Sequence, residues 1–241
     1  MTPFIQACIA ANEEIATALQ QQFDSEWLEK TEVGAGGDVS SKLDLFAEAI
    51  FIKHLSPFGH IDSEESGRVG EGEEKIIIDP IDGSSNALCF FPYFGTSVAK
   101  VNADGILDDA IVCNLANGDL FFKTSQEGVK KGKLFSNDFR APIQSIEGEI
   151  GLFEKAYEHP HIAALLREKG LKFRSPGAVA LSLAYAHTVQ FVLFVGVFRI
   201  YDVAAGLALC EGLEVIVEGD YVIVSKDKNI VQEIEALITS L

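Results

Sequence analysis

DPIDGSSN, residues 79–86, is the stretch that most narrows the fold and the function of this chain. It places two carboxylates, Asp79 and Asp82, three positions apart, followed by a glycine, two hydroxyls and an amide. The apolar run at 75–78 predicts a buried strand that ends at Asp79. Gly83 permits a bend or a close approach of the backbone to a ligand, and Ser-Ser-Asn after it is typical of a helix N-terminus. Acids at a strand end beside free N–H groups are suited to hold divalent cations and a phosphate together.

Composition indicates an acidic globular protein. The chain has 241 residues, of which 48% are hydrophobic, and a formal net charge of -17. We expect a single domain over 1–241, with halves at roughly 1–145 and 146–241. The negative charge argues against nonspecific binding to nucleic acid or to an anionic membrane. An acidic protein that binds a phosphate ester also needs cations at its site to offset its own field.

The cysteines and the N-terminus both indicate the cytoplasm. The four cysteines are widely scattered and form no Cys-x-x-Cys pair, which favours free thiols in a reducing compartment. The N-terminus lacks a basic region, so no signal peptide is expected. The segment 175–198 carries no formal charge and is long enough to span a membrane. Its helix-favouring first half and Val/Phe-rich second half favour a buried helix followed by a buried strand.

Hydrophobic periodicity predicts the following elements. In the first half, helices are expected at 3–30 and 43–55, and strands at 60–62, 75–78, 96–102, 106–115 and 120–123. In the second half, helices are expected at 159–169, 178–187, 203–212 and 229–240, and strands at 171–174, 189–198, 213–217 and 221–225. The segment 125–150 is expected to be rich in loops. The alternation in the second half indicates an α/β layered fold.

Five acids fall at the ends of predicted elements: Asp44, Glu64, Asp79, Asp82 and Asp202. Hard cations such as Mg²⁺ prefer carboxylate, carbonyl and water oxygens. Two such ions about 4 Å apart can hold an attacking water and a leaving oxygen in line across a phosphorus. Taken singly, each acid has an ordinary interpretation as a turn cap, a helix N-cap or a solvated surface charge. Only the set indicates a metal site.

The order and spacing of three sequence blocks resemble the inositol monophosphatase superfamily of Mg²⁺-dependent, lithium-sensitive phosphatases. The blocks are 38–44 with 61–66, 79–86, and 201–206. The likeness extends over nearly the whole chain, and the middle block is its most specific part. The resemblance implies a five-layer αβαβα sandwich.

The resemblance also implies roles for individual residues. Two or three Mg²⁺ ions, for which Mn²⁺ could substitute, would be held by Glu64, Asp79, the Ile81 carbonyl, Asp82 and Asp202. Asp44 and Ser84 would activate the water, because Ser84 can accept its hydrogen bond while Asp44 takes up proton charge. The substrate would be bound by backbone groups of Gly83, Ser84, Ser85 and Gly177.

The substrate is less closely defined than the reaction. Inositol-specific members carry an acid seven positions before the last ligand, where this chain has Val195, which cannot accept a hydrogen bond. We expect hydrolysis of a small polyol or sugar phosphate by in-line attack of a metal-activated water. Residues 82–86 also resemble the fructose-1,6-bisphosphatase branch, which is the first alternative. A 3'(2'),5'-bisphosphate nucleotidase and an inactive scaffold that keeps the fold are further alternatives, and a homodimer is plausible by the same resemblance.

Overall fold

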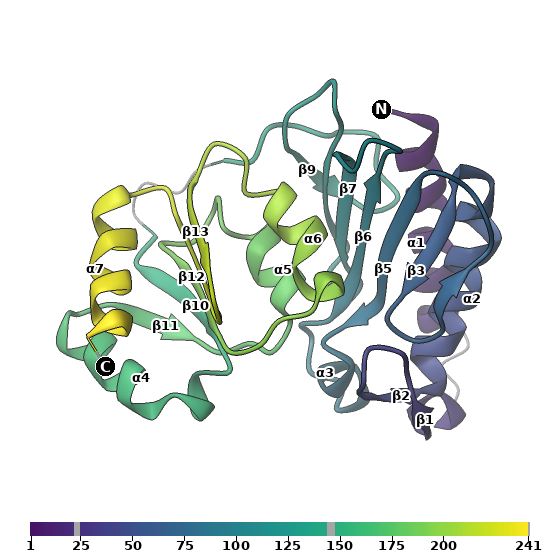
Figure 1. Cartoon of the computed structure of the whole chain (residues 1–241). Helices are drawn as coiled ribbons and strands as arrows, with labels where there is room; N and C mark the ends of the chain where they lie inside the picture. Colours follow the sequence, from purple (N-terminus) through teal and green to yellow (C-terminus); the bar gives the residue numbers. More distant parts are fainter. Residues whose placement is uncertain (22–24, 144–147, 241) are drawn as a thin grey trace.

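Two β-sheets, each covered by helices on both faces, form five layers in the order αβαβα (Figure 1). The computed structural model describes residues 1–21, 25–143 and 148–240. The N-terminal helices form the outermost layer on one side, and the C-terminal helix belongs to the outermost layer on the other. The fold class predicted from the sequence is confirmed.

The first sheet has seven strands in the order β4-β3-β5-β6-β7-β8-β9. The strands are β3 (His60–Ser63), β4 (Gly67–Val69), β5 (Lys75–Asp82), β6 (Gly95–Val101), β7 (Leu107–Asn114), β8 (Asp119–Lys123) and β9 (Lys130–Lys133). All neighbours pair antiparallel except β3 and β5, which are parallel. The turns on either side of β7 contain Gly105 and Gly118, whose φ angles of 80° and 74° suit tight hairpins.

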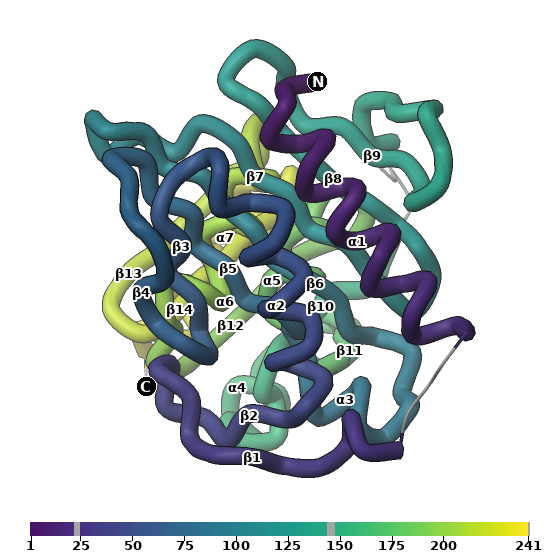
Figure 2. Tube along the Cα trace, turned by 90° about the vertical axis from the view of Figure 1, so that its right-hand side faces the viewer, coloured from purple at the N-terminus to yellow at the C-terminus, as the bar shows by residue number. Residues whose placement is uncertain are grey.

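Helices α1 (Pro3–Gln21) and α2 (Lys42–Leu55) cover the outer face of this sheet (Figure 2). Phe51 of α2 and Ile76 and Ile78 of β5 belong to the core on that side. Ile77 belongs to the core on the opposite side, as the two-residue period of a strand requires. Strand β5 is therefore buried on both faces, and its carboxyl end is held firmly at the edge of the layer.

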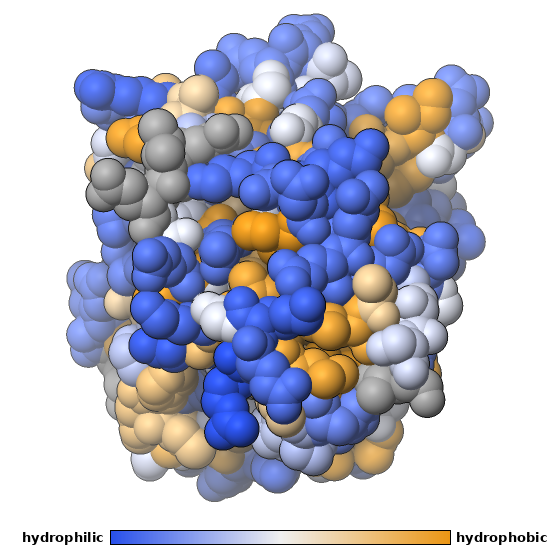
Figure 3. Space-filling view, turned by 90° about the vertical axis from the view of Figure 1, so that its left-hand side faces the viewer, coloured by the Kyte–Doolittle hydropathy of each residue, from blue (hydrophilic) through white to orange (hydrophobic). Residues whose placement is uncertain are grey.

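The second sheet has five strands in the order β11-β10-β12-β14-β13. They are β10 (Ile150–Glu154), β11 (Lys172–Arg174), β12 (Val192–Val195), β13 (Glu214–Glu218) and β14 (Tyr221–Ser225). Helices α5 (Val179–Ala184) and α6 (Ile200–Ala208) lie between the two sheets, and α4 (Pro160–Glu168) and α7 (Lys228–Thr239) cover the far face. The outer surface on that far side is mainly hydrophilic, with scattered hydrophobic side chains (Figure 3).

Several short elements complete the described structure. Strands β1 (Lys30–Val33) and β2 (Val39–Ser41) form a two-stranded sheet, and α3 (Ser84–Leu88) directly follows β5. The 3-10 helices occupy Ser25–Leu28, Ser56–Phe58 and Ala156–Glu158.

Two predictions in the first half are wrong in extent. The helix expected at 3–30 ends at Gln21, and residues 30–33 form β1, because they pair with β2 in an antiparallel sheet. Residues 22–24 lie outside the described residues. The loop-rich segment expected at 125–150 contains β9, which pairs with β8, and its last residue starts β10. Part of that segment, 144–147, also lies outside the described residues.

Two predictions in the second half are also wrong in extent. The strand expected at 189–198 covers only Val192–Val195, because Gly196 takes a φ of 132° and turns the chain. The helix expected at 203–212 begins earlier, at Ile200, and ends at Ala208. Asp202 consequently lies inside the first turn of α6 and not before it.

The uncharged segment 175–198 forms α5 and β12, as predicted. In the described parts of the chain, no helix has the length and apolar character needed to cross a membrane. The four cysteines are free thiols, of which Cys89 is exposed and the other three are buried.

Candidate active site

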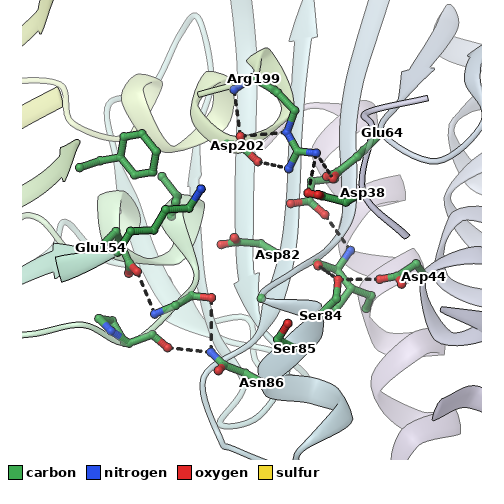
Figure 4. A pocket seen from close by; sticks show the side chains of 18 of the residues that line it. Asp38, Asp44, Glu64, Asp82, Ser84, Ser85, Asn86, Glu154, Arg199 and Asp202 are labelled. Atoms are coloured by element: carbon green, nitrogen blue, oxygen red, sulfur yellow. Dashed lines mark hydrogen bonds and ion pairs between the residues drawn. The ribbon is translucent and has the colours of Figure 1, made fainter. Parts of the chain in front are cut away.

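A pocket of about 680 Å³ lies where the carboxyl end of β5 faces the second sheet (Figure 4). That volume is ordinary for a pocket that binds a small molecule. Every residue predicted to hold metal, activate water or contact substrate lines it: Asp44, Glu64, Asp79, Ile81, Asp82, Gly83, Ser84, Ser85, Gly177 and Asp202. The fold thus brings together residues from five separate parts of the chain: 44, 64, 79–85, 177 and 202.

The end of β5 differs from the sequence prediction, because the strand continues through Asp82. Its pairing with β6 shifts register between Asp79 and Asp82, where Pro80 has no N–H to donate. An oxygen of Asp79 accepts a hydrogen bond from the N–H of Ile81 at 3.0 Å. An oxygen of Asp82 accepts one from the N–H of Leu181 in α5 at 2.8 Å. The irregular strand end therefore presents both carboxylates to one pocket.

Gly83 makes the turn from β5 into α3. Its φ of 84° is in the left-handed region, and a Cβ there would lie 3.0 Å from the Cβ of Ala178 and 3.1 Å from the carbonyl oxygen of Tyr93. Only glycine fits this position without strain. Helix α3 begins immediately afterwards, so the N–H groups of Ser84 and Ser85 have no acceptor within the helix, whereas that of Asn86 donates to the Gly83 carbonyl oxygen at 2.8 Å.

Three carboxylates converge at the centre of the pocket. Glu64, Asp79 and Asp202 each offer an oxygen, and these oxygens all lie within 4.8 Å of one another. Burial, followed by the charges of the neighbouring carboxylates, raises the pKa of Asp79 well above its usual value. Burial also raises the pKa of Glu64, to about 7. A set of buried, mutually repelling carboxylate oxygens suits a hard divalent cation, so the residues present fit the metal that the sequence implies.

Asp82 is a further buried carboxyl in the pocket, and its pKa is shifted in the same direction as that of Asp79. Burial raises the pKa of its carboxyl well above the usual value, although the N–H of Leu181 acts in the opposite direction. The charges of Glu154, Asp202 and Glu64 raise it further. A cation at the cluster would relieve this repulsion as well.

Ser84 and Asp44 form a hydrogen-bonded pair on the other side of the β5 end. The Ser84 hydroxyl oxygen lies 2.9 Å from an Asp44 carboxylate oxygen and 2.9 Å from the Ile81 carbonyl oxygen. Asp44 is held in place by a capping box at the start of α2, in which its other oxygen accepts hydrogen bonds from the N–H and the hydroxyl of Ser41, both at 2.6 Å. This anchoring fixes the carboxylate oxygen that faces Ser84 (Figure 4).

Arg199 is a site residue that the sequence analysis did not single out. Its guanidinium lies 2.8 Å from Glu64 and 2.9 Å from both Asp202 and Asp38, and it donates to the Gly36 carbonyl oxygen at 3.1 Å (Figure 4). Burial alone would lower its pKa, but hydrogen bonds to Asp202 raise it above the usual value. Arg199 therefore neutralises part of the acidic cluster. Its position three residues before Asp202 is the only sequence signal that could have indicated this contact.

Glu154 is the second residue that the sequence analysis missed. It ends β10 and is 1% exposed. Its carboxylate accepts hydrogen bonds from the N–H of Gly177 at 2.8 Å, the N–H of Ala178 at 3.4 Å and the hydroxyl of Ser182. An apolar run ending in an acid, as at Asp79, is the signal that could have identified it.

The surroundings of Gly177 bear on its predicted contact with the substrate. Its N–H donates to Glu154, and its carbonyl oxygen accepts a hydrogen bond from the side-chain amide of Asn86 at 3.4 Å. The same amide donates to the carbonyl oxygens of Tyr93 and Pro176, both at 2.7 Å. Asn86 and Glu154 thus fix the 176–178 loop against the β5 end.

Val195 is absent from the pocket wall. It is 6% exposed and lies in the core on the far face of the second sheet, while its neighbour Phe194 lines the pocket. Adjacent strand residues point to opposite faces, which accounts for the difference. In this chain the position therefore lacks both the acid and the orientation of an inositol contact.

Comparison with known proteins identifies the family. A profile of the inositol monophosphatase family matches residues 1–218. The chain belongs to the inositol monophosphatase family. The family consists of metal-dependent phosphatases, which are phosphoric monoester hydrolases, so the enzyme class predicted from the sequence is confirmed.

Two relatives and one solved structure illustrate the likeness. A bifunctional NADP phosphatase/NAD kinase of Methanocaldococcus jannaschii is 27% identical over 83% of this chain, which spans only 40% of that protein. A fructose-1,6-bisphosphatase/inositol-1-monophosphatase of Methanothermobacter thermautotrophicus is 30% identical over 74% of this chain and 70% of its own length. The crystal structure of the extragenic suppressor protein SuhB from Bartonella henselae matches over 100% of both chains with a TM-score of 0.79 and 22% identity. That structural likeness establishes the fold.

Proposed function

We propose that this chain is a Mg²⁺-dependent phosphomonoesterase that hydrolyses a small phosphorylated polyol or sugar. One observation carries the proposal: the hydrogen-bonded Ser84–Asp44 pair and the cluster of Glu64, Asp79 and Asp202 line the same pocket. Carboxylates that can hold divalent cations, beside a proton acceptor, are what metal-assisted attack of water on a phosphate ester requires.

The residues divide the work as follows. Glu64, Asp79, Asp82, Asp202 and the Ile81 carbonyl would hold the ions, which supply charge neutralisation and lower the pKa of the attacking water. The Ser84 hydroxyl donates its proton towards Asp44 or Ile81, which leaves a lone pair on its oxygen to accept a hydrogen bond from that water. Asp44 then holds the proton charge that develops as the water attacks.

Backbone groups at the start of α3 would orient the phosphate. The N–H groups of Gly83, Ser84 and Ser85 have no acceptor within the helix and belong to residues that line the pocket. Such groups favour an anion. At Gly177, however, both polar backbone groups already have protein partners, so we assign it the role of shaping the pocket beside Asn86.

A second candidate substrate class is a molecule with more than one phosphate. Val195 is apolar and faces away from the pocket, which removes the contact expected for inositol. Of the relatives named above, one is a fructose-1,6-bisphosphatase/inositol-1-monophosphatase and the other an NADP phosphatase, and both fructose 1,6-bisphosphate and NADP carry additional phosphate groups. Val195 therefore favours a bisphosphate or a phosphorylated dinucleotide over inositol phosphate, and the relatives' names include such substrates.

A panel of phosphate monoesters tests the proposal. We expect phosphate release from inositol 1-phosphate, fructose 1,6-bisphosphate or NADP in the presence of Mg²⁺, and loss of that release when EDTA replaces the metal. Hydrolysis that persists in EDTA, or no hydrolysis of any ester with Mg²⁺ or Mn²⁺, would refute it and favour an inactive scaffold. Sensitivity to lithium and a homodimeric state stay predictions that follow from the resemblance, and a cytoplasmic location stays a prediction from the cysteines and the N-terminus.

A further inference from the structure

The pocket has two walls, and each of them carries acids. The wall at the end of β5 carries the acidic cluster described above. The opposite wall belongs largely to the second sheet and the segments that follow its strands, and it includes two acids, Glu154 and Glu158, and one cation, Lys155. The part of a substrate that is not hydrolysed must lie against this second wall.

Lys155 is the cation of the second wall. It directly follows β10 and lies partly buried with its ammonium 5.5 Å from the centre of the Phe194 ring. Contact with an aromatic face restricts where the ammonium can move. Its φ of 55° is in the left-handed region, which is uncommon for a residue with a side chain and recurs at binding sites.

The charge of Lys155 acts on the adjacent Glu154, where it opposes the rise in pKa that burial causes, but it is not held in a direct ion pair in the described residues. In the described ranges of the chain, its ammonium forms no salt bridge, whereas Arg199 in the same pocket is engaged by Asp38, Glu64 and Asp202. The adjacent Glu154 is already satisfied by the donors of Gly177, Ala178 and Ser182. The charge of Lys155 is therefore available to a ligand.

Lys30, the other lysine that lines the pocket, lies on the acidic side. Its strand β1 pairs Lys30 with Ser41, and Ser41 in turn binds Asp44. Lys155 is thus placed to contact the far end of a substrate whose reacting phosphate lies at the β5 wall.

We propose that Lys155 binds a second anionic group of the substrate, so that this enzyme prefers phosphate esters that carry another phosphate or diphosphate. This inference rests on the proposed function and assigns its substrate class. A charge-assisted contact of this kind strengthens binding about tenfold to a hundredfold. Because the contact is made before and during the reaction alike, it acts on KM and leaves kcat nearly unchanged.

Two matched pairs of substrates test the inference and separate the sources of the second charge. Fructose 1,6-bisphosphate is compared with fructose 1-phosphate, and NADP with adenosine 2'-phosphate. In at least one pair we expect Lys155→Met to raise the KM of the more highly charged member about tenfold or more, while its partner changes by less than about twofold. Lys155→Arg should retain the preference. Lys172→Met, at an exposed lysine of β11 that does not line the pocket, removes the same charge and should leave both members unchanged.

The preference is also measured as binding, so that it does not depend on turnover. Calorimetry with the same four compounds and Mg²⁺, on the slow Ser84→Ala protein with and without Lys155→Met, should show the same loss for the more highly charged compound. An equal effect of Lys155→Met on both members of each pair, or no effect on any, overturns the inference. Absence of hydrolysis by the wild-type protein would instead refute the proposed phosphatase activity.

Discussion

Strands β5 and β10 end in the same sequence pattern, an apolar run followed by an acid, yet their acids have different surroundings. Asp79 accepts a hydrogen bond from Ile81 and faces the carboxylates of Glu64 and Asp202. Glu154 is equally buried but accepts hydrogen bonds from two N–H groups and a hydroxyl. Burial raises the pKa of both carboxyls. Burial alone therefore does not distinguish the two acids. Asp79 has few protein donors and lies among like charges, which is why we propose Asp79, and not Glu154, as a metal ligand.

The largest expected effect is on enzyme activity. We expect a residue of the β5 wall to act in the reaction itself and a residue of the β10 wall to act only by shaping the pocket. Ser84→Ala removes the hydroxyl that accepts the water's hydrogen bond, so we expect kcat to fall about 10²-fold or more with Mg²⁺ binding retained. Glu154→Gln, which only loosens the 176–178 loop, should lower kcat/KM by about tenfold. Steady-state kinetics at saturating Mg²⁺ measure both, with Ser56→Ala at an exposed helix end as the control. Equal losses of activity in the two variants would contradict the assignment of different roles to Ser84 and Glu154.

A second prediction concerns the free energy of unfolding, which substitution of Asp79 should raise and substitution of Glu154 should lower. In the metal-free protein, Asp79→Asn removes a repelling charge and retains an acceptor for Ile81, so we expect stabilisation of about 1 kcal/mol at pH 8. Glu154→Gln places an amide N–H₂ against existing donors and leaves one of them without an acceptor, which should cost about 1–3 kcal/mol. Urea unfolding in EDTA measures both. Destabilisation of similar size in the two variants would mean that the acids have the same role.

The smallest expected effect is a pH dependence of the metal-free fold. Burial raises the pKa of both Glu64 and Glu65 to about 7. A carboxyl with a raised folded-state pKa binds its proton more tightly when folded, so the stability it contributes falls as pH rises from about 4.5 to about 7. We expect the unfolding temperature in EDTA to drop by a few degrees between pH 5 and 7.5.

Two controls test whether these carboxyl groups cause the pH dependence. Glu65→Gln should flatten the slope, because it removes one of the titrating groups without removing a predicted ligand. Saturating Mg²⁺ should reduce the drop as well, because the ions favour the ionised carboxylates. An unfolding temperature that rises with pH in EDTA over the same window would contradict the sign.

Site residues that lie in one contiguous motif could be predicted from the sequence, whereas those that depend on long-range contacts could not. The motif at 79–86 is contiguous, and its acids, glycine and hydroxyls could be assigned before the fold was known. Arg199 and Glu154 could not, because their roles depend on side chains that tertiary packing brings from other parts of the chain. The same holds for Gly177, whose N–H is taken by a residue 23 positions earlier in sequence.

The fold shows the same division between local and long-range information. Helix α7 and the hairpin strands around Gly105 and Gly118 follow from periodicity and turn residues. Strand β1 is not predicted from the sequence, and the helix expected at 3–30 includes its first residue, because only the pairing with β2 makes this segment a strand. Strand β12 was predicted too long, because an apolar run does not show where Gly196 turns the chain.

Magnesium titration of the wild-type protein and of Asp79→Asn, with phosphate release measured on the same samples, tests the metal-dependent active site most directly. Asp104→Asn, in an exposed turn, is the matched control. We expect the wild-type and Asp104→Asn proteins to bind Mg²⁺ and hydrolyse their substrate alike, and Asp79→Asn to lose both properties, with turnover falling more than about 10³-fold. Asp79→Asn protein that binds Mg²⁺ and turns over like the wild type would contradict the assignment of this pocket as the active site.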